Sequence, residues 1–480
     1  MGGIGAQYAG DVDIEEALLI SPTGNITDLK RDVVMNEVNI FEDMFKSSIT
    51  GNIIIIDVNN VVTKVPIVGQ EYLTLKIRTP TLTIKRDMID FTDNPFAVHK
   101  VTLRQEISSG GQVYQLKFVS QEAIKSSQRK ISKSYYDRNA NIGAIVFDLL
   151  AQNKDGIQTS KEVFIQPTLG RRPYVIPNIN PFDIITKLSN EAVSKIGTGE
   201  FSGNPSPHYL FFENKDGIHF RTLQSLYNKD VKETFHVGDI GFDERVIGGD
   251  KDSGKLIQNF RRILEYEIKT RKDLFVNSAS GMLGGRTISH DIYKKNYTVT
   301  EYNYLDDDDF EKYGRISEDE ASAFRVYNTD RFLSQDFSKS ITHLVPVSKT
   351  TTGLDANYTT SDNLDGSTDP SNLEENYLQR QSRMMELSNG VHIQATVNGR
   401  TNLTAGDMVF ITVPSIRGND PDNPFYTGRY IVRALRHTIA PTVRQHLITM
   451  EITRDTSPSD FPSFGSPYED LSPTIEPTQV

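Results

Sequence analysis

The stretch that decides the fold occurs twice, as GQEYLTLKIRTP at residues 69–80 and as GDMVFITVP at residues 406–414. Each copy opens with a glycine followed by an acid, continues as an alternating strand and stops at a proline. Each copy then has a strand with a Leu-Arg pair and an isoleucine, which is KVTLRQEI at 100–107 and VRALRHTI at 432–439, and a closing strand, at 113–119 and 446–453. Strand and turn signals repeated in one order predict a duplicated β domain.

Strands also dominate the sequence around the first copy. Residues 12–118 read as β throughout, and we expect Tyr114, Leu116 and Phe118 to face a core while Gln115 and Lys117 face outward. A barrel or sandwich accommodates so many short strands without leaving long exposed edges. We therefore predict a mainly β fold with α+β insertions, built on two homologous antiparallel β-barrels. Four glycines are predicted at landmark turns of these barrels: Gly51, Gly69, Gly406 and Gly428.

A chain of 480 residues is long enough for about three domains. The predicted divisions are a first barrel at 1–122, an α+β insert at 123–258, the first part of a second barrel at 259–305, an acidic polar insertion with short helices at 306–388, the second part of that barrel at 389–456, and a tail rich in Pro and Ser at 457–480.

Local signals place helices and a hairpin inside the insertions. Asn141 can cap one helix, and Pro181 suits the first position of another. Lys215-Asp216-Gly217 between two apolar runs predicts a β-hairpin. Capping-box spacing at 317–320 and 371–374 predicts two further helices, the second ending at Gly390. A basic face on a helix after residue 120 would carry Lys125, Arg129, Lys130 and Lys133, and a solvated surface is favoured there over an acidic partner.

The bulk properties exclude several classes of function. A net charge of −11 argues against a general nucleic-acid binder held by phosphate contacts, and suits a surface that repels a passing polyanion. The absence of cysteine excludes disulfides, thiolate metal sites and cysteine nucleophiles. The N-terminus lacks the pattern of a signal peptide, and the apolar runs are too short to span a membrane, so we expect a cytosol-like environment and no membrane insertion.

The sequence offers little positive sign of catalysis or metal binding. Ser289, His290 and Asp291 have the residue types of a catalytic triad, but neighbours on a strand point to opposite faces. The histidines show no paired ligand spacing. The run Asp306 to Asp309 could attract a divalent cation, although a solvated acidic loop is favoured. Paired carboxylates for glycoside cleavage stay open, because the fold assembles them. We therefore predict no catalytic, cofactor-binding or metal-binding residues, no cofactor, and no enzyme activity.

A family resemblance is carried by several motifs in order. They are VNIFEDMF at 38–45, TGNIIIID at 50–57, VPIVGQE at 65–71, NPFD at 180–183, YLFFENKDGIHF at 209–220, the segment 281–291, and the closing strands from Ala405 to Val432. Together they resemble the baseplate hub proteins of T-even-type myophages, over most of residues 10–455. The polar stretch at 306–388 and the tail have no counterpart in this resemblance.

The resemblance implies a structural role. In such hubs two similar barrels per subunit form a homotrimeric ring with near-sixfold symmetry, which joins a threefold central spike to a sixfold tail tube. Expected partners are further copies of the chain, the central spike, and tube-initiator or tube proteins, with the tape measure and baseplate wedge proteins as further candidates. Genomic DNA is expected to pass through the lumen without specific binding. The expected location is the tail baseplate of the virion. Alternatives are a hub or spike subunit of a bacterial contractile injection system, a tail-associated cell-wall hydrolase, and a glycan-binding tail protein.

Overall fold

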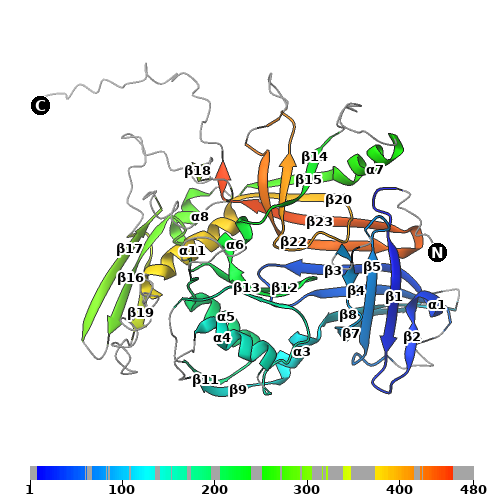
Figure 1. The fold of residues 1–480 in the computed structure, drawn as a ribbon, viewed down its shortest axis with the longest axis horizontal. Helices are drawn as coiled ribbons and strands as arrows, with labels where there is room; N and C mark the ends of the chain where they lie inside the picture. The colour runs from blue at the N-terminus through cyan, green and yellow to red at the C-terminus, as the bar shows by residue number, and fades with distance from the viewer. Residues whose placement is uncertain are drawn as a thin grey trace, which may run out of the picture.

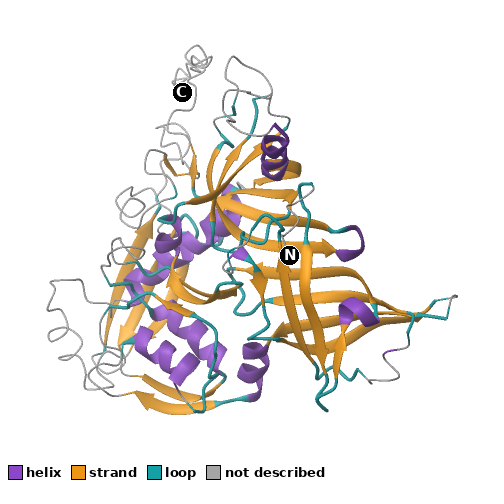
Figure 2. Ribbon diagram, turned by 45° about the vertical axis from the view of Figure 1, so that its right-hand side comes forward, coloured by secondary structure: helices purple, strands orange, loops and turns teal. Residues whose placement is uncertain are grey.

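The structure is a computed structural model dominated by β-strands (Figure 1). It describes residues 8–59, 61, 67–82, 84, 87–107, 110–135, 141–152, 154–169, 174–195, 206–238, 251–270, 273–291, 295–304, 316, 321–322, 339–347, 373–415, 422–423 and 425–457. Helices gather mainly in the insertions, whereas the two large β units are almost entirely strand (Figure 2).

The first β unit is a six-stranded curved sheet around its own apolar core. Alternation places Tyr114, Leu116 and Phe118 in that core, each at most 1% exposed, which confirms the orientation predicted for this strand. In spatial order the strands are β1 (Asp13–Ile20), β5 (Tyr72–Arg78), β7 (Phe96–Glu106), β8 (Gln112–Ser120), β4 (Thr50–Asp57) and β3 (Val34–Asp43). Short strands β2 (Ile26–Asp28) and β6 (Ile89–Asp90) pair with β1 and β5, and the one-turn helix α1 (Leu29–Asp32) precedes β3.

The second β unit is a closed six-stranded barrel with a separate core. Its strands in spatial order are β14 (Val231–Val237), β21 (Met408–Thr412), β22 (Gly428–Ala440), β23 (Gln445–Arg454), β20 (Val391–Asn398) and β15 (Arg262–Thr270). Parallel pairing of His236 with Arg262 and of Val237 with Ile263 closes the ring. Helix α7 (Lys251–Arg261) leads into β15, and the 3₁₀ turn η5 (Pro441–Val443) joins β22 to β23.

The two units share one strand order. Numbered along the chain within each unit, the strands lie side by side in the order 1-4-5-6-3-2 in both. Two β-bulges also recur at matching places: after Val98 in β7 and after Val432 in β22, and after Met35 in β3 and after Ile263 in β15. Bulges re-aim a strand at fixed positions, so shared bulges indicate a shared architecture. The predicted duplicated β domain is confirmed.

The units differ at the first strand. In the second unit β14 is parallel to both of its neighbours, whereas in the first unit β1 is antiparallel to β5. Among the described residues no pairing joins β1 to β3, so strand pairing leaves a seam in the first unit where β14 and β15 close the second. The prediction of two antiparallel barrels is thus right for most of the pairings and wrong for β14.

Three sequence-based assignments need correction. Because β14 belongs to the second barrel, that barrel begins before the predicted boundary at 259. The strands at Gly284–Asp291 and Asn296–Asn303, in the range predicted for the barrel, belong to a separate sheet. The two Leu-Arg pairs are not equivalent either. The amide of Val98 donates to the Glu71 carbonyl just as the amide of Val432 donates to the Asp407 carbonyl, so Val98 and Val432 are equivalent. An alignment on this pair differs by two residues from the alignment on the Leu-Arg pairs.

The α+β insert has a core of its own. Its predicted helices are confirmed: Asn141 caps α4 (Ile142–Phe147), and Pro181 opens α5 (Pro181–Glu191). The basic helix is shorter than predicted, because α3 (Gln121–Gln128) ends before β9 (Ile131–Tyr135), so Lys133 lies on a strand. The remaining elements are a π-helical turn at Asp148–Gln152, β10 (Val163–Ile165), β11 (Tyr174–Ile179), the hairpin strands β12 (Tyr209–Asn214) and β13 (Gly217–Thr222), and α6 (Leu223–Tyr227).

A second insertion separates β15 from β20. It contains α8 (Leu274–Ala279) and a sheet of β17 (Asn296–Asn303), β16 (Gly284–Asp291) and β19 (Thr342–Val347), against which α11 (Leu373–Asn389) packs. Helix α11 ends just before Gly390, as predicted. Strands β18 (Ala321–Ser322) and β24 (Thr456–Ser457) form a small pair. The capping box at 317–320, the run Asp306 to Asp309 and residues 458–480 lie outside the described residues.

Candidate functional site

The two β units are joined edge to edge. Strand β3 pairs antiparallel with the second half of β22, from Val38 opposite Ile439 to Asp43 opposite Ala434, so one continuous sheet runs through both units (Figure 1). Arg436 crosses this joint and donates from Nε to Asn39 Oδ1 at 2.8 Å. The joint is therefore held by backbone pairing and by side chains on its face.

The β12–β13 hairpin lies at the centre of the molecule, between the insert and both β units. All of its strand residues are buried. At its tip Asn214 Nδ2 donates to the carbonyl of Ala405, in the loop before β21, at 2.9 Å. Asn214 Oδ1 in turn lies 2.9 Å from His219 Nε2, which fixes the orientation of the amide. The predicted hairpin is confirmed, and its tip docks the insert on the second barrel.

Glu42 connects all three parts at one point. It lies on β3 at 2% exposure, and its carboxylate accepts hydrogen bonds from Thr404 Oγ1, from Ala405 N at 2.9 Å and from Lys215 N at 3.1 Å. Burial raises the pKa of Glu42 to about 7, although the hydrogen bonds from Thr404 and Ala405 act to lower it. This side chain therefore links the first unit, the hairpin and the second barrel.

Glu213 docks the same hairpin on the first unit. Its carboxylate accepts from Ile49 N at 3.1 Å, from Ser120 Oγ, and from Lys161 Nζ at 2.5 Å. Lys161 also pairs with Glu122 at 2.7 Å, so one buried cation serves two buried carboxylates. Burial raises the pKa of Glu213, while the two carboxylates outweigh burial and raise that of Lys161. Such a triad fixes the relative position of its elements, because a buried charge left without its partner is costly.

A third buried ionic cluster ties α11 to the end of the second barrel. Arg383 Nη1 lies 2.8 Å from Glu386 Oε2 and 3.4 Å from Asp455 Oδ2. Tyr304 donates its hydroxyl to Glu386 at 2.6 Å. Burial raises the pKa of Glu386 to about 7, and Arg383 acts to lower it. These contacts fix the second insertion to the second barrel.

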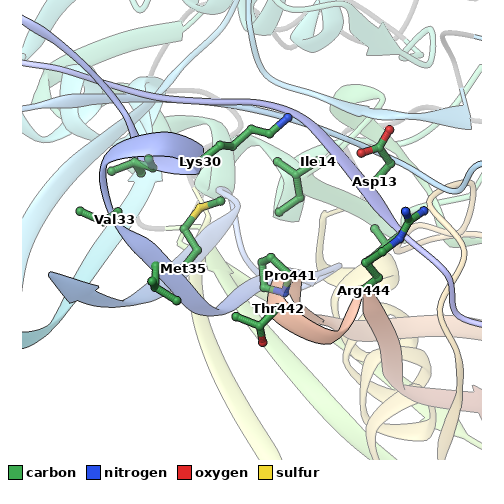
Figure 3. A pocket seen from close by; sticks show the side chains of 11 residues that line it. Asp13, Ile14, Lys30, Val33, Met35, Pro441, Thr442 and Arg444 are labelled. Carbon is green, nitrogen blue, oxygen red and sulfur yellow. The ribbon is translucent and has the colours of Figure 1, made fainter. Parts of the chain in front are cut away.

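A cavity of about 340 Å³ occupies the seam of the first unit (Figure 3). Its walls come from β1, α1 and the start of β3, and its floor comes from the turn between β22 and β23 of the second barrel. Figure 3 labels Ile14 and Met35 on the first unit, facing Pro441 and Arg444 on that turn. Arg444 Nε bonds Asp11 Oδ1 at 3.0 Å, which holds the turn in the seam. The second barrel thus fills part of the gap in the first.

The predicted landmark glycines fall into two groups. Gly69 and Gly406 have φ of +83° and +86° and lie in a bend and a turn, respectively, before equivalent strands. The acid that follows explains the motif: Glu71 accepts from the amides of Val68, Gly69 and Gln70 at 2.7 to 3.0 Å, and Asp407 accepts from Thr404 N at 3.1 Å. The motif of glycine and acid therefore builds the turn itself.

The other two glycines are not turn residues. Gly428, at φ +148°, is the first residue of β22. Gly51 lies inside β4, where a Cβ would come within 2.2 Å of Phe118 Cζ and 2.4 Å of the Asn39 carbonyl oxygen. The prediction for Gly51 is wrong in its reason, because the residue permits close packing of the core and does not form a turn.

Ser289 and His290, which have residue types found in catalytic triads, are not brought together. Ser289 is buried and His290 exposed on β16, as expected for neighbours on a strand. Across the described residues, no group of three or more His, Cys, Asp or Glu side chains is placed to hold a metal ion. Within the same residues, no helix is long and apolar enough to cross a membrane.

Sequence reasoning missed the buried ionic residues that join the parts, Glu42, Glu213, Lys161 and Arg383. The available signal was indirect: Glu42 lies in the quoted run at 38–45, and Glu213 lies in the hairpin motif at 209–220. Both runs are otherwise rich in apolar residues, and an acid within such a run is a candidate for a paired, buried position.

Comparison with known proteins supports the resemblance. No family model matches the chain. The probable baseplate hub protein gp334 of Vibrio phage KVP40 is 23% identical over 345 residues, which cover 68% of this chain and 69% of that protein. Among solved structures, the tail protein from Neisseria meningitidis MC58 has a TM-score of 0.47 at 11% identity, covering 92% of this chain and 96% of that one. A type VI secretion system component of E. coli has a TM-score of 0.43 at 8% identity, covering 94% and 78%. The match to gp334 shows that the chain is similar in sequence to a phage baseplate hub protein, in agreement with the resemblance of its motifs.

Proposed function

We propose that the protein is the structural hub of a contractile phage tail baseplate, in which three copies form a ring of six similar β units. The observation that carries this proposal is the pair of units with one strand order, joined edge to edge within one chain. A chain with two equivalent units converts threefold symmetry into near-sixfold symmetry, because each copy presents the same architecture twice around the axis. The similarity to a phage baseplate hub protein supports the same assignment.

In this role the ring joins a threefold central spike on one face to a sixfold tail tube on the other. Its partners are further copies of the chain, the spike, and tube-initiator or tube proteins, with the tape measure and baseplate wedge proteins as further candidates. The genome passes through the lumen without specific binding, and the net charge of −11 suits a channel that does not retain DNA. The chain acts without catalysis, at the tail baseplate of the virion.

The experiment that tests this proposal is light scattering on the purified chain, with negative-stain images of the same fraction. A species of about three times 54.0 kDa with a central hole and a near-sixfold outline is expected. If the chain alone is monomeric, it is co-expressed with the spike protein of the same phage, because the spike supplies a threefold template. A monomer in both preparations contradicts the proposal and favours a glycan-binding or a hydrolytic tail protein. Binding and cleavage assays on purified peptidoglycan distinguish these two alternatives.

A further inference from the structure

The joint inside the chain uses a particular edge of β22. The first part of β22 pairs with β21, from Gly428 opposite Ile411 to Ile431 opposite Met408. Beyond the bulge after Val432, the same edge is released from β21 and pairs with β3 instead. The bulge therefore separates a part that stays in its own barrel from a part that reaches the other unit.

The counterpart of β22 in the first unit is β7, and its corresponding edge has no strand beside it. Residues Phe96 and Ala97 pair with β5, and the matching bulge follows Val98. Beyond it, β8 pairs on one side with residues 100–102 and, after a second bulge, with residues 105–106. No described strand pairs with these residues on the other side. Residues 103–106 are exposed, and Leu103 has 60% of its surface accessible.

The counterpart of β3 in the second unit is β15, and it shows the same feature. Residues Arg262 and Ile263 pair with β14, and the matching bulge follows Ile263. Beyond it, residues 265–270 pair with β20 on one side and, within the described part of the chain, with no strand on the other. Apolar side chains are exposed at the bulge, where Leu264 is 49% exposed, and in the segment beyond it, where Tyr266 is 40% exposed.

We propose that these two edges pair with each other between copies, so that residues 100–106 of β7 in one copy lie antiparallel to residues 265–270 of β15 in the next. This inference rests on the proposed ring and specifies how it is held. The β15–β7 contact repeats the β3–β22 contact, and alternating the two contacts gives six equivalent joints around the axis. A head-to-tail contact of this kind closes into a ring when its rotation matches the symmetry.

The bulges fix the register of the contact. Arg436 lies four residues beyond Val432 and pairs with Phe41, which lies four residues beyond Glu37. The same steps from Val98 and from Glu265 lead to Thr102 and Lys269. Thr102 of one copy is therefore opposite Lys269 of the next.

This register is also chemically acceptable. The second bulge of β7, between Thr102 and Gln105, adds one residue there, so Gln105 comes opposite Glu267 and Glu106 comes opposite Tyr266. Through β8 and β23 these two pairs correspond to Thr438 with Asn39 and to Ile439 with Val38 in the joint within the chain. No like charges face each other directly among these pairs, and directly opposed like charges destabilise a sheet. Pairing also covers two exposed backbone edges, which a soluble protein otherwise leaves open to aggregation.

Cysteine cross-linking tests the contact cleanly, because the chain has no native cysteine. The variant carries Thr102→Cys and Lys269→Cys and is oxidised as purified ring, alone or with the spike. Directly opposed strand residues lie about 4.5–5.5 Å apart between Cα atoms, which a disulfide spans. The register control carries Thr102→Cys and Glu265→Cys, and the matched positive control carries Phe41→Cys and Arg436→Cys at the equivalent pair within one chain.

The expected result is a covalent dimer and trimer for the Thr102→Cys, Lys269→Cys variant, none for the register control, and an intrachain disulfide for the positive control. Mixing the two single-cysteine variants must give a dimer that neither forms alone. A ring of about three times 54.0 kDa in reducing buffer without this cross-link overturns the strand contact and leaves the hub proposal standing. A chain that stays monomeric even with the spike overturns both, and cross-linking of the register control overturns the register.

Discussion

Replacing Glu42 tests whether one buried carboxylate holds the two β units and the hairpin together. In Glu42→Ala the hydroxyl of Thr404 and the amides of Ala405 and Lys215 lose their acceptor inside the protein. Each buried donor left unpaired costs about 1–3 kcal/mol, and the relief from burying a carboxylate offsets part of the sum. We expect a net loss of about 3–5 kcal/mol in the free energy of unfolding.

The pH dependence gives a second, independent signature of Glu42. Its pKa rises from 4.5 to about 7 on folding, so between these values the folded state binds more protons than the unfolded state. Stability from this group is therefore fully present below pH 4.5 and is lost as the pH rises through about 7, by about 3 kcal/mol in total. Glu386 acts in the same direction. The Glu42→Gln variant should lose the Glu42 part of this slope.

The assay is thermal unfolding followed by circular dichroism at pH 5, 7 and 8, combined with hydrogen exchange of peptides that contain Ala405 and Lys215. The matched control is Glu37→Gln on the same strand, whose partly exposed ion pair with Arg436 should contribute less than about 1 kcal/mol. Glu42→Ala is expected to melt well below both wild type and the control, with faster exchange at Ala405. A Glu42→Ala variant that melts with Glu37→Gln and exchanges like wild type would refute the reasoning.

Four further outcomes are expected. Gly406→Val should destabilise the second barrel by about 1–3 kcal/mol, since φ is +86° and the new Cβ would lie 3.2 Å from Phe212 Cζ. The control Gly24→Val, at φ +85° with no atom near the new Cβ, measures the cost of backbone strain alone, and an unchanged melting temperature for Gly406→Val contradicts the prediction. Lys161→Met should lower the free energy of unfolding by about 3–5 kcal/mol, measured by urea unfolding, because Glu122 and Glu213 lose their buried cation. Restored stability in the triple variant Lys161→Met, Glu122→Gln, Glu213→Gln would show that the unpaired carboxylates cause the loss. His437 and His446 are buried, with His437 Nδ1 3.0 Å from His446 Nε2, and burial lowers the pKa of both, that of His446 to about 3. Their contribution to stability is therefore present above pH 6.5 and is lost as the pH falls. His446→Gln should make stability depend less on pH in the acid range, and an unchanged dependence would exclude the pair as its source. Deleting 348–369, outside the described residues, should leave the oligomer intact by light scattering, and loss of the soluble oligomer would place that segment at an interface.

Local patterns in the sequence were enough to find most strands and the repeat. The glycine-acid turn is a self-contained signal, because Glu71 and Asp407 bond to amides within three residues of themselves. Alternation in 113–119 and the caps at Asn141 and Pro181 are equally local. Such features depend on neighbours along the chain, so the sequence displays them directly.

Features that depend on distant partners could not be predicted in the same way. Strand β14 has a clear alternation of Phe235 and Val237, but only its parallel pairing with β21, about 175 residues further on, assigns it to the barrel. The two Leu-Arg pairs look equivalent in the sequence, and only the contacts of Val98 with Glu71 and of Val432 with Asp407 show that they are two residues out of step. The partner of Glu42 could not be predicted from the sequence, because Thr404 lies 362 residues away.

The β3–β22 joint also has a consequence for the order of events during synthesis. Asn39 and Arg436, which bond across it, are 397 residues apart, so at roughly 5–20 residues per second a ribosome makes β3 roughly 20–80 s before its partner strand exists. During that interval the edge of β3 and the seam beside β1 have nothing to cover them. The first unit therefore depends on the last-made strands for its completion, and an interrupted translation product should be recognised by chaperones or proteases before it can enter an assembling particle.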